Sequence, residues 1–359
     1  MRLTASSSAA HAVALATVLA VACTLPAAPA SAQGARDFIS IAGSSTVYPF
    51  SAAVAENFGK AHRRFKTPKV EATGTGGGIK LFCSGVGVST IDVANASRRM
   101  KASEFQDCQK NGVREIVEVK IGFDGIVLAN AKAAPTYQLT RREIWLALAR
   151  QVPDPKNPNA FVANPYRNWN QINPKLPNTR IEVLGPPPTS GTRDAFLELV
   201  MDAGCEAFPN IKALKQSDSK RARQVCQTIR EDGAYVEAGE NDNLIVQKLN
   251  SNPRALGIFG YSFLEENLNT LHGSIIEGAA PTFENITDGK YPVSRSMYVY
   301  VKKAHVGVIP GLREFVQEFV SDRAMGEEGY LADKGLVPLP KAEAARVRQA
   351  AQQMTAMKL

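Results

Sequence analysis

The sequence predicts an α/β protein of two domains. The chain has 359 residues, 44% of them hydrophobic and 21% charged, and this length suits two domains of about 150 residues better than one core. Apolar, β-rich runs alternate with segments of helical periodicity, which is the pattern of an α/β fold. The apolar fraction is too high for a disordered chain.

The charge balance points to an anionic partner. The chain carries 42 Lys and Arg against 34 Asp and Glu, a formal net charge of +8. A basic protein attracts nucleic acid or small anions. The densest basic segment, residues 60–66, reads as a solvated helix end, where cations suit the helix dipole. We therefore expect a small anion and no nucleic acid.

Residues 1–32 are typical of a secretory signal. Arg2 is followed by an Ala/Val/Leu run over residues 12–22, by two prolines, and by the small-residue site Ala30-Ser31-Ala32. This order predicts cleavage before Gln33 and a periplasmic protein. An uncleaved anchor is disfavoured because the apolar run is short for a membrane span. Lipidation at Cys23 is the weaker alternative, because Ala20 stands where a lipobox prefers Leu.

The remaining cysteines agree with export. Cys83, Cys108, Cys205 and Cys226 stay after cleavage, and four cysteines allow three connectivities. Local pairing, Cys83–Cys108 and Cys205–Cys226, is the simplest, and each bridge would contribute about 3 kcal/mol in an oxidising compartment. Reduced, buried thiols are the alternative. Zinc is not expected, since no C-x-x-C pair exists and the four histidines are scattered.

Three strand–turn–helix units carry the functional signal. The first runs from a strand at residues 38–43 through Ser44-Ser45-Thr46, where a helix N-cap belongs, to a helix with Phe50, Val54 and Phe58 on one face. In the second, residues 70–78 end in a glycine run before 79–82. In the third, residues 181–189 precede Ser190-Gly191-Thr192-Arg193-Asp194, and the helix behind carries Phe196, Leu199 and Val200.

These turns suit an oxyanion. Glycine lets the backbone approach a ligand, and the first turn of a helix offers free N–H groups at its positive end. Serine and threonine hydroxyls add donors from several directions. A capped helix without any ligand is the alternative for each unit taken alone.

Competing motifs are absent from the sequence. The glycine run at 74–78 lacks the G-K-[ST] ending of a phosphate-binding loop and the spacing of a dinucleotide fingerprint. No G-x-S-x-G surrounds Ser190, and no H-E-x-x-H helix occurs. We therefore expect no enzyme activity, no cofactor and no metal.

The rest of the chain is assigned in order. We expect an apolar strand interrupted by Asp-Gly at 122–130, which would cross between the domains, and a capping box at Thr140–Glu143 opening a helix. The remaining assignments are a Pro- and Asn-rich loop at 152–178, a helix at 237–249, a strand at 255–263, a strand at 297–301 and a helical tail at 341–357.

Seven segments in this order resemble the periplasmic phosphate-binding protein of Pst-type ABC importers, over roughly residues 38–340. The resemblance implies a two-lobed type II periplasmic solute-binding fold with the ligand in the interdomain cleft. We expect lobe I at 37–126 plus 273–359 and lobe II at 127–272. The segments are Gly43–Phe50, Gly74–Lys80, Asp92–Arg98, Gly122–Ile126, Ser190–Asp194, Gly257–Tyr261 and Tyr291–Arg295.

The same resemblance implies the contacts to phosphate. Two departures matter: Ser97 stands where well-known members have an Asp acceptor, and Pro186 stands four residues before the Ser-Gly-Thr, where they have Arg. Arg98 and Arg193 are therefore nominated as charge partners and Asp124 as the acceptor. The predicted phosphate-binding set is Ser45, Thr46, Val47, Thr75, Gly76, Ser97, Arg98, Asp124, Ser190, Gly191, Thr192 and Arg193.

The acceptor would decide selectivity. Phosphate near neutral pH still carries a proton that a carboxylate can accept, whereas sulfate presents only lone pairs and like charge. Alternative roles are a surface salt bridge for Arg98, a solvent-pointing side chain for Arg193 and a hinge or turn position for Asp124.

The predicted function is high-affinity binding of inorganic phosphate and delivery to the permease subunits of an ABC importer, by a monomer that closes about a hinge. A receptor for sulfate, molybdate or another tetrahedral oxyanion is the main alternative. A phosphate-binding sensor that does not serve transport is the second.

Overall fold

The computed structural model describes residues 36–154, 156–188, 190–239 and 242–359. The predicted signal at 1–32 lies outside the described residues. Within these ranges, no helix is both long enough and apolar enough to cross a membrane.

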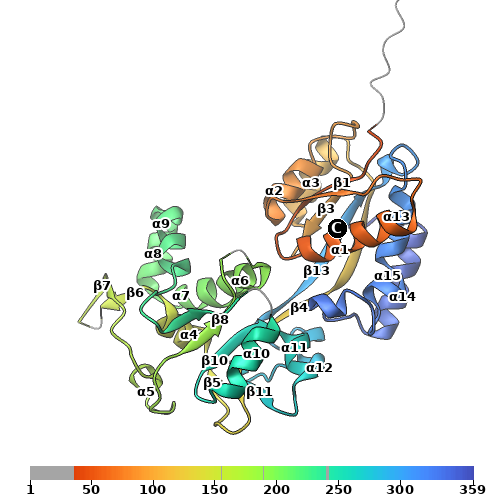
Figure 1. Ribbon diagram of the computed structural model, residues 1–359. Coiled ribbons are helices and arrows are strands. Elements are labelled where there is room, and N and C mark those ends of the chain that lie inside the picture. The colour runs from red at the N-terminus through yellow and green to blue at the C-terminus, as the bar shows by residue number, and fades with distance from the viewer. Residues whose placement is uncertain (1–35, 155, 189, 240–241) are drawn as a thin grey trace, which may run out of the picture. The chain divides into compact units, whose positions relative to one another are not determined.

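One sheet organises the described chain (Figure 1). Its order is β2-β1-β3-β13-β4-β10-β8-β9, with β11 paired to β4 beside this path. The alternation of strands and helices confirms the predicted α/β class. The strands of this sheet are β1 (Ser40–Gly43), β2 (Lys69–Ala72), β3 (Val93–Ala96), β4 (Ile116–Ala131), β8 (Val183–Gly185), β9 (Tyr235–Glu237), β10 (Leu256–Gly260), β11 (Leu271–Gly273) and β13 (Ser294–Lys302).

Strand β4 connects the two halves of the sheet. Its first part pairs antiparallel with β13, and its second part pairs with β10 and β11. The interruption predicted at Asp124-Gly125 is wrong, because both residues continue the strand and pair with β13. Nearly every residue of β4 is buried. A strand that is covered on both faces is rich in apolar residues along its whole length, which is the pattern seen in much of β4.

The helices gather around the two halves of the sheet. In Figure 1, α1–α3 and α13–α15 surround β1, β3 and β13, whereas α4–α11 surround β8 and β10. Their bounds are α1 (Tyr48–Ala61), α2 (Thr75–Phe82), α3 (Ala102–Lys110), α4 (Arg141–Leu148), α5 (Trp169–Ile172), α6 (Gly191–Phe196), the π-helix η1 (Leu197–Asp202), α7 (Ala203–Cys205), α8 (Pro209–Ser217), α9 (Ser219–Gln227), α10 (Asp242–Ser251), α11 (Tyr261–Glu266), α12 (Phe283–Thr287), η2 (Lys303–His305), α13 (Leu312–Phe319), α14 (Asp322–Met325), η3 (Ala332–Lys334) and α15 (Lys341–Gln352).

Several local predictions are confirmed. Phe50, Val54 and Phe58 are buried on the inner face of α1. The capping box is present: the Thr140 hydroxyl accepts from the Glu143 amide, and the Glu143 carboxylate accepts from the Thr140 amide. Both features depend on residues within one or two helical turns, which is why the sequence pattern identifies them.

Two assignments are wrong. The loop expected at 152–178 contains the hairpin of β6 (Gln151–Asp154) and β7 (Asn157–Ala163) and the short helix α5. The helix expected from Glu237 is described from Asp242, and residues 235–237 form β9. Strand β9 pairs with β8, so a partner distant in sequence overrides the local helical signal.

Both predicted disulfides are confirmed. Cys83–Cys108 joins the end of α2 to α3, and Cys205–Cys226 joins α7 to α9. The four cysteines are buried. The bridged cysteines are 25 and 21 residues apart in the chain, and each bridge lies within one half of the sheet, as local pairing predicts.

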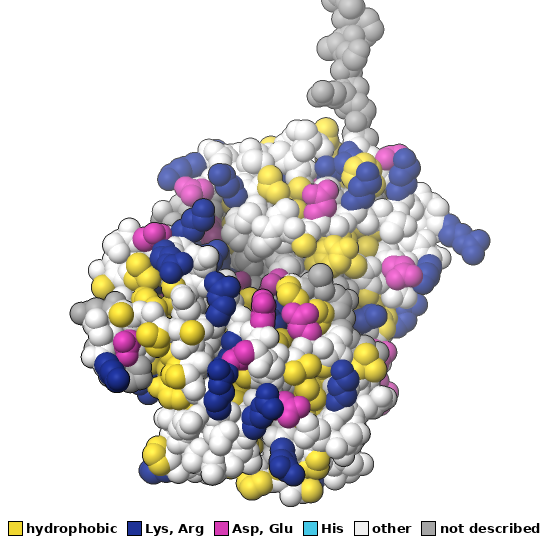
Figure 2. Space-filling view, turned by 60° about the vertical axis from the view of Figure 1, so that its left-hand side comes forward, with side chains coloured by type: hydrophobic (Ala, Val, Ile, Leu, Met, Phe, Trp, Pro, Cys, Tyr) yellow, Lys and Arg dark blue, Asp and Glu magenta, His cyan; other side chains and the backbone are white. Residues whose placement is uncertain are grey.

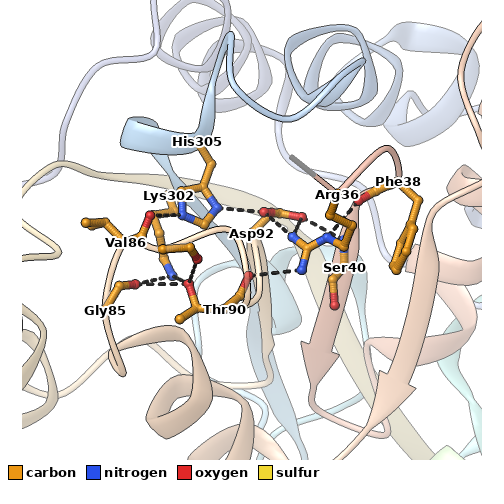
Figure 3. A network of polar contacts seen from close by, with 10 residues as sticks. Arg36, Phe38, Ser40, Gly85, Val86, Thr90, Asp92, Lys302 and His305 are labelled. Carbon is orange, nitrogen blue, oxygen red and sulfur yellow. Dashed lines mark hydrogen bonds and ion pairs between the residues drawn. The ribbon is translucent and has the colours of Figure 1, made fainter. Parts of the chain in front are cut away.

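Asp92, just before β3, centres a buried polar network (Figure 3). Both of its oxygens lie 2.6 Å from Arg36 Nη2, and Oδ1 lies 2.6 Å from His305 Nδ1. Nearby, Lys302 Nζ donates to the Gly85 carbonyl and the Thr90 hydroxyl, and burial lowers its pKa to about 8. The network fixes the start of the described chain to this half of the sheet.

Candidate functional site

A cavity of about 400 Å³ lies between the first and third glycine-hydroxyl turns. Most of its lining comes from chain segments at the ends of strands, which is where ligands bind in open α/β sheets. The lining residues are Ser45, Thr46, Tyr48, Pro49, Phe50, Asp124, Ser190, Gly191, Thr192, Asp242, Gly260, Phe263, Asp333, Lys334 and Gly335.

The first turn places the side chains of Ser45 and Thr46 at the cavity. Gly43 ends β1 with a φ of +146°, and a Cβ there would lie 2.1 Å from the Asn95 carbonyl oxygen, so only glycine fits. The N-cap expected within residues 44–46 is wrong: the N-cap of α1 is Val47, and no side chain caps this helix. The Ser44 hydroxyl accepts from the Val47 amide at 3.3 Å, one residue before the helix begins. Val47 is fully buried and does not line the cavity.

The third turn lies directly against the first. Ser190 caps α6 by accepting from the Thr192 amide at 3.2 Å. A Cβ on Gly191 would lie 3.3 Å from the Ser45 carbonyl oxygen. The Ser45 hydroxyl donates to Asp194 at 2.7 Å. The structure therefore brings together Ser45, Thr46, Ser190, Gly191 and Thr192 as predicted lining residues.

The second turn does not line this cavity. The Thr75 and Ser97 hydroxyls lie 3.0 Å apart, and the Ser97 amide donates to the Thr75 hydroxyl. Neither residue lines the cavity between the other two turns, and Gly76 lines a separate cavity of about 390 Å³ beside α3. The glycines of this turn also begin α2 earlier than predicted, because Gly78 packs against the backbone of Gly43.

Neither predicted arginine lines the cavity. Arg98 forms two hydrogen bonds with Glu104, which raise its pKa, so the salt-bridge alternative describes its position. Arg193 is buried, which rules out the solvent-pointing alternative. Its guanidinium lies 4.5 Å from the centre of the Tyr235 ring and donates to the Pro186 carbonyl.

Asp124 reaches the cavity from β4. It is 8% exposed, and its Oδ2 has no hydrogen-bond partner among the described residues. Burial raises the pKa of this carboxyl, while the positive charge of Arg295 acts in the opposite direction. An ionised Asp124 is an acceptor only, which is the property expected of the group that recognises a protonated oxyanion.

Two contributors to the site were not predicted. Asp242, at the start of α10, accepts from the Gly260 amide at 3.0 Å, and burial raises its pKa to about 6. Arg295, on β13, contacts both Thr46 and Asp124. Arg295 stands in the segment Tyr291–Arg295, which resembles the family. A positively charged residue in such a segment is a candidate for the anion site, and this was the signal that could have identified it. Asp242 offers no comparable signal, because acids are common at helix starts.

The surface and the cavity differ in charge. Lys and Arg are dispersed over the face shown in Figure 2, with Asp and Glu between many of them. Around the cavity the described charged lining residues are three acids, Asp124, Asp242 and Asp333, and Lys334. Across the described residues, no group of three or more His, Cys, Asp and Glu side chains could hold a metal ion.

The fold and this site define an α/β binding protein whose cavity is lined by hydroxyls, buried carboxylates and apolar side chains. A family model described as the PBP superfamily domain matches residues 26–323. The chain belongs to this family, and the resemblance to periplasmic phosphate-binding proteins is confirmed.

Relatives and solved structures agree. The chain is 32% identical over 336 residues to Protein SphX of Synechococcus elongatus, covering 90% of this chain and 83% of that one. It is 29% identical over 305 residues to the Phosphate-binding protein PstS of Staphylococcus saprophyticus, covering 83% and 79%. A possible phosphate binding protein from Planctomyces limnophilus superposes with a TM-score of 0.67 at 25% identity, covering 89% and 98%.

A phosphate transport receptor from Vibrio cholerae superposes with a TM-score of 0.54 at 20% identity, covering 84% of this chain and all of that one. At this identity the likeness shows the fold alone. These structures confirm the two-lobed type II fold expected from the sequence.

Proposed function

We propose that this chain binds inorganic phosphate outside the cytoplasm and delivers it to the permease subunits of an ABC importer. The observation that carries the proposal is the composition of the cavity: neutral donors from two turns face a buried carboxylate, Asp124. Relatives named as phosphate-binding proteins support the choice of anion. We infer binding without turnover, by a monomer.

The selectivity follows from donor and acceptor roles. Hydroxyls of Thr46, Ser190 and Thr192 can donate to the unprotonated oxygens of phosphate, whereas the single hydroxyl proton of Ser45 is used in its bond to Asp194. Asp124 can accept the one proton that phosphate retains near neutral pH. Sulfate has no such proton, so it would leave a buried carboxylate facing like charge, which costs several kcal/mol (about 1–3 for the unmade hydrogen bond, more for the charge).

Closure about the hinge would enclose the anion. We propose that lobe I comprises 37–126 plus 273–359 and lobe II comprises 127–272, which places Ser45 and Asp194 in different lobes. Their hydrogen bond and the close approach of Gly191 to Ser45 are then contacts across the cleft. The roles predicted for Val47, the second turn, Arg98 and Arg193 remain predictions, to be decided by a phosphate-bound structure.

Calorimetric titration with phosphate and with sulfate, at one pH below and one above neutrality, tests the function. We expect tight phosphate binding and sulfate binding weaker by at least about 100-fold, the factor that about 3 kcal/mol gives. Comparable affinity for the two anions would identify a general oxyanion receptor. N-terminal sequencing of the exported chain tests cleavage before Gln33.

A further inference from the structure

Arg295 lies where three parts of the site meet. Its Nη2 donates to the Thr46 hydroxyl at 2.6 Å, its Nε lies 3.5 Å from Asp124 Oδ2, and its Nη1 pairs with Glu198. These partners come from the first turn, from β4 and from η1. One guanidinium therefore contacts two cavity-lining residues, Thr46 and Asp124, and a carboxylate on the helix that follows the third turn.

The sheet fixes this position. Arg295 on β13 is the register partner of Asp124 on β4 in the antiparallel pair. The Arg295 side chain is only 11% exposed. Its Nε and Asp124 Oδ2 are both buried, and neither has a hydrogen-bond partner among the described residues. The two strands thus hold Arg295 and Asp124 as a charge pair beside the cavity, and each residue keeps one buried polar atom free for a further hydrogen bond.

The bond to Arg295 determines what Thr46 can do. A guanidinium has donors and no acceptor, so the Thr46 oxygen must accept in this bond. The hydroxyl carries a single proton, which the bond to Arg295 does not use. Thr46 lines the cavity, so that proton is available to an anion there. Arg295 therefore commits Thr46 to the role of donor.

The same charge acts on Asp124. Burial is the larger influence and raises the pKa of this carboxyl, whereas the guanidinium of Arg295, its register partner at 3.5 Å, favours the carboxylate. The carboxylate can only accept. A site with Thr46 as donor and Asp124 as acceptor distinguishes a tetrahedral oxyanion that carries a proton from one that does not.

We propose that Arg295 is a positioning and specificity-determining residue, which fixes Thr46 as a donor and Asp124 as an acceptor and thereby sets the preference for a protonated tetrahedral oxyanion. This inference rests on the proposed function. Arg98 and Arg193 are bonded elsewhere, whereas Arg295 contacts two residues that line the cavity.

Titration of the purified chain and its variants with phosphate and with sulfate tests the inference. Arg295→Gln removes the charge and retains one amide donor. We expect phosphate affinity to fall by at least about tenfold, the lower end for a hydrogen bond to a charged group. The phosphate-to-sulfate ratio should fall as well, because the substitution removes the charge that favours the Asp124 carboxylate, the form that repels sulfate. Arg295→Lys retains the charge, so it should preserve more of that ratio than Arg295→Gln.

A double-mutant cycle with Thr46→Val isolates the coupling. If Arg295 acts through the Thr46 hydroxyl, Arg295→Gln should cost less phosphate affinity in the Thr46→Val background than in the wild type. Arg99→Gln is the matched control, because Arg99 is half-exposed, pairs with Glu118 and lies outside the cavity lining. It should leave both affinities unchanged.

The outcomes separate the two proposals. Failure of the wild-type chain to prefer phosphate overturns the proposed function and this inference with it. If the wild type prefers phosphate, unchanged affinity in Arg295→Gln, or an equal loss for both anions, overturns the inference alone. An equal loss would mark Arg295 as a structural residue. Should Arg295→Gln not fold, Arg295→Met, which also removes the charge, takes its place in the titrations and in the Thr46→Val cycle and is judged by the same criteria.

Discussion

Asp242 should make the stability of the protein depend on pH. It is 7% exposed, it lines the same cavity as Asp124, and its carboxylate accepts from the Gly260 amide. Burial is the main cause that raises its pKa to about 6, and the nearby Asp124 charge adds to the increase. Replacing Asp242 by Asn removes the titration while retaining an oxygen that can accept the Gly260 bond.

The magnitude follows from linkage. The pKa of Asp242 rises from 3.8 in the unfolded chain to about 6 in the folded one, so the folded state binds more protons between these values. The contribution of Asp242 to the free energy of unfolding is therefore fully present below the lower value and is lost as pH rises through about 6. At about 1.4 kcal/mol per pH unit, the loss is about 3 kcal/mol.

Chemical denaturation at constant ionic strength, without phosphate, measures this effect. The quantity of interest is the free energy of unfolding of Asp242→Asn minus that of the wild type, followed from acid to neutral pH. We expect this difference to rise by about 3 kcal/mol in favour of the variant. In an Asp124→Asn background the rise should be smaller, because the like charge is gone.

Asp333→Asn is the matched control, because it neutralises an exposed carboxyl that lines the same cavity. We expect Asp333→Asn to leave the free energy of unfolding close to that of the wild type, because an exposed carboxylate is solvated in the folded chain. A difference between Asp242→Asn and the wild type that stays constant from acid to neutral pH would refute the reasoning from burial.

Three further predictions concern the site and its supports. Asp124→Asn should weaken phosphate binding by at least about tenfold in calorimetric titration and narrow the gap to sulfate, whereas unchanged phosphate affinity would exclude Asp124 as the acceptor. The pair Cys205→Ala with Cys226→Ala removes one bridge and should lower the free energy of unfolding by about 2–5 kcal/mol in non-reducing denaturation; no loss would show that the bridge constrains little. Gly43→Ala should destabilise the protein by more than about 1 kcal/mol in thermal or chemical denaturation, because its Cβ would collide with the Asn95 backbone, while wild-type stability would show that the turn can shift.

The parts of the site that the sequence predicts are those made by neighbouring residues. The first and third turns follow from glycine, hydroxyl and helix signals within a few positions, and both line the cavity. The sequence close to Arg98 could also have predicted where its side chain lies. Glu104, at the third position of α3, accepts from the Lys101 amide and from Arg98, so the segment Lys101–Glu104 is a helix cap that retains the arginine.

The parts that the sequence does not predict depend on distant partners. Nothing near Arg295 in the chain indicates that β13 places it opposite Asp124, because strand register is set by the whole sheet. The prolines and asparagines of the segment 152–178 predict a loop. In the structure Asn164 donates to the Leu146 and Ala149 carbonyls, which ties this segment to the end of α4.

The charge of the whole chain and the charge of the cavity have different effects on anions. The net charge of +8 can raise the local concentration of anions, yet the described charged residues that line the cavity are three acids and one lysine. A site that relied on positive charge would hold any anion of similar size. Neutral donors and the buried carboxylate of Asp124 disfavour an anion that lacks a proton to give. Arg295, which lies outside the lining, assigns the roles of Thr46 and Asp124. The basic surface therefore favours the approach of anions to the protein, and the acidic groups of the cavity favour phosphate over anions without a proton.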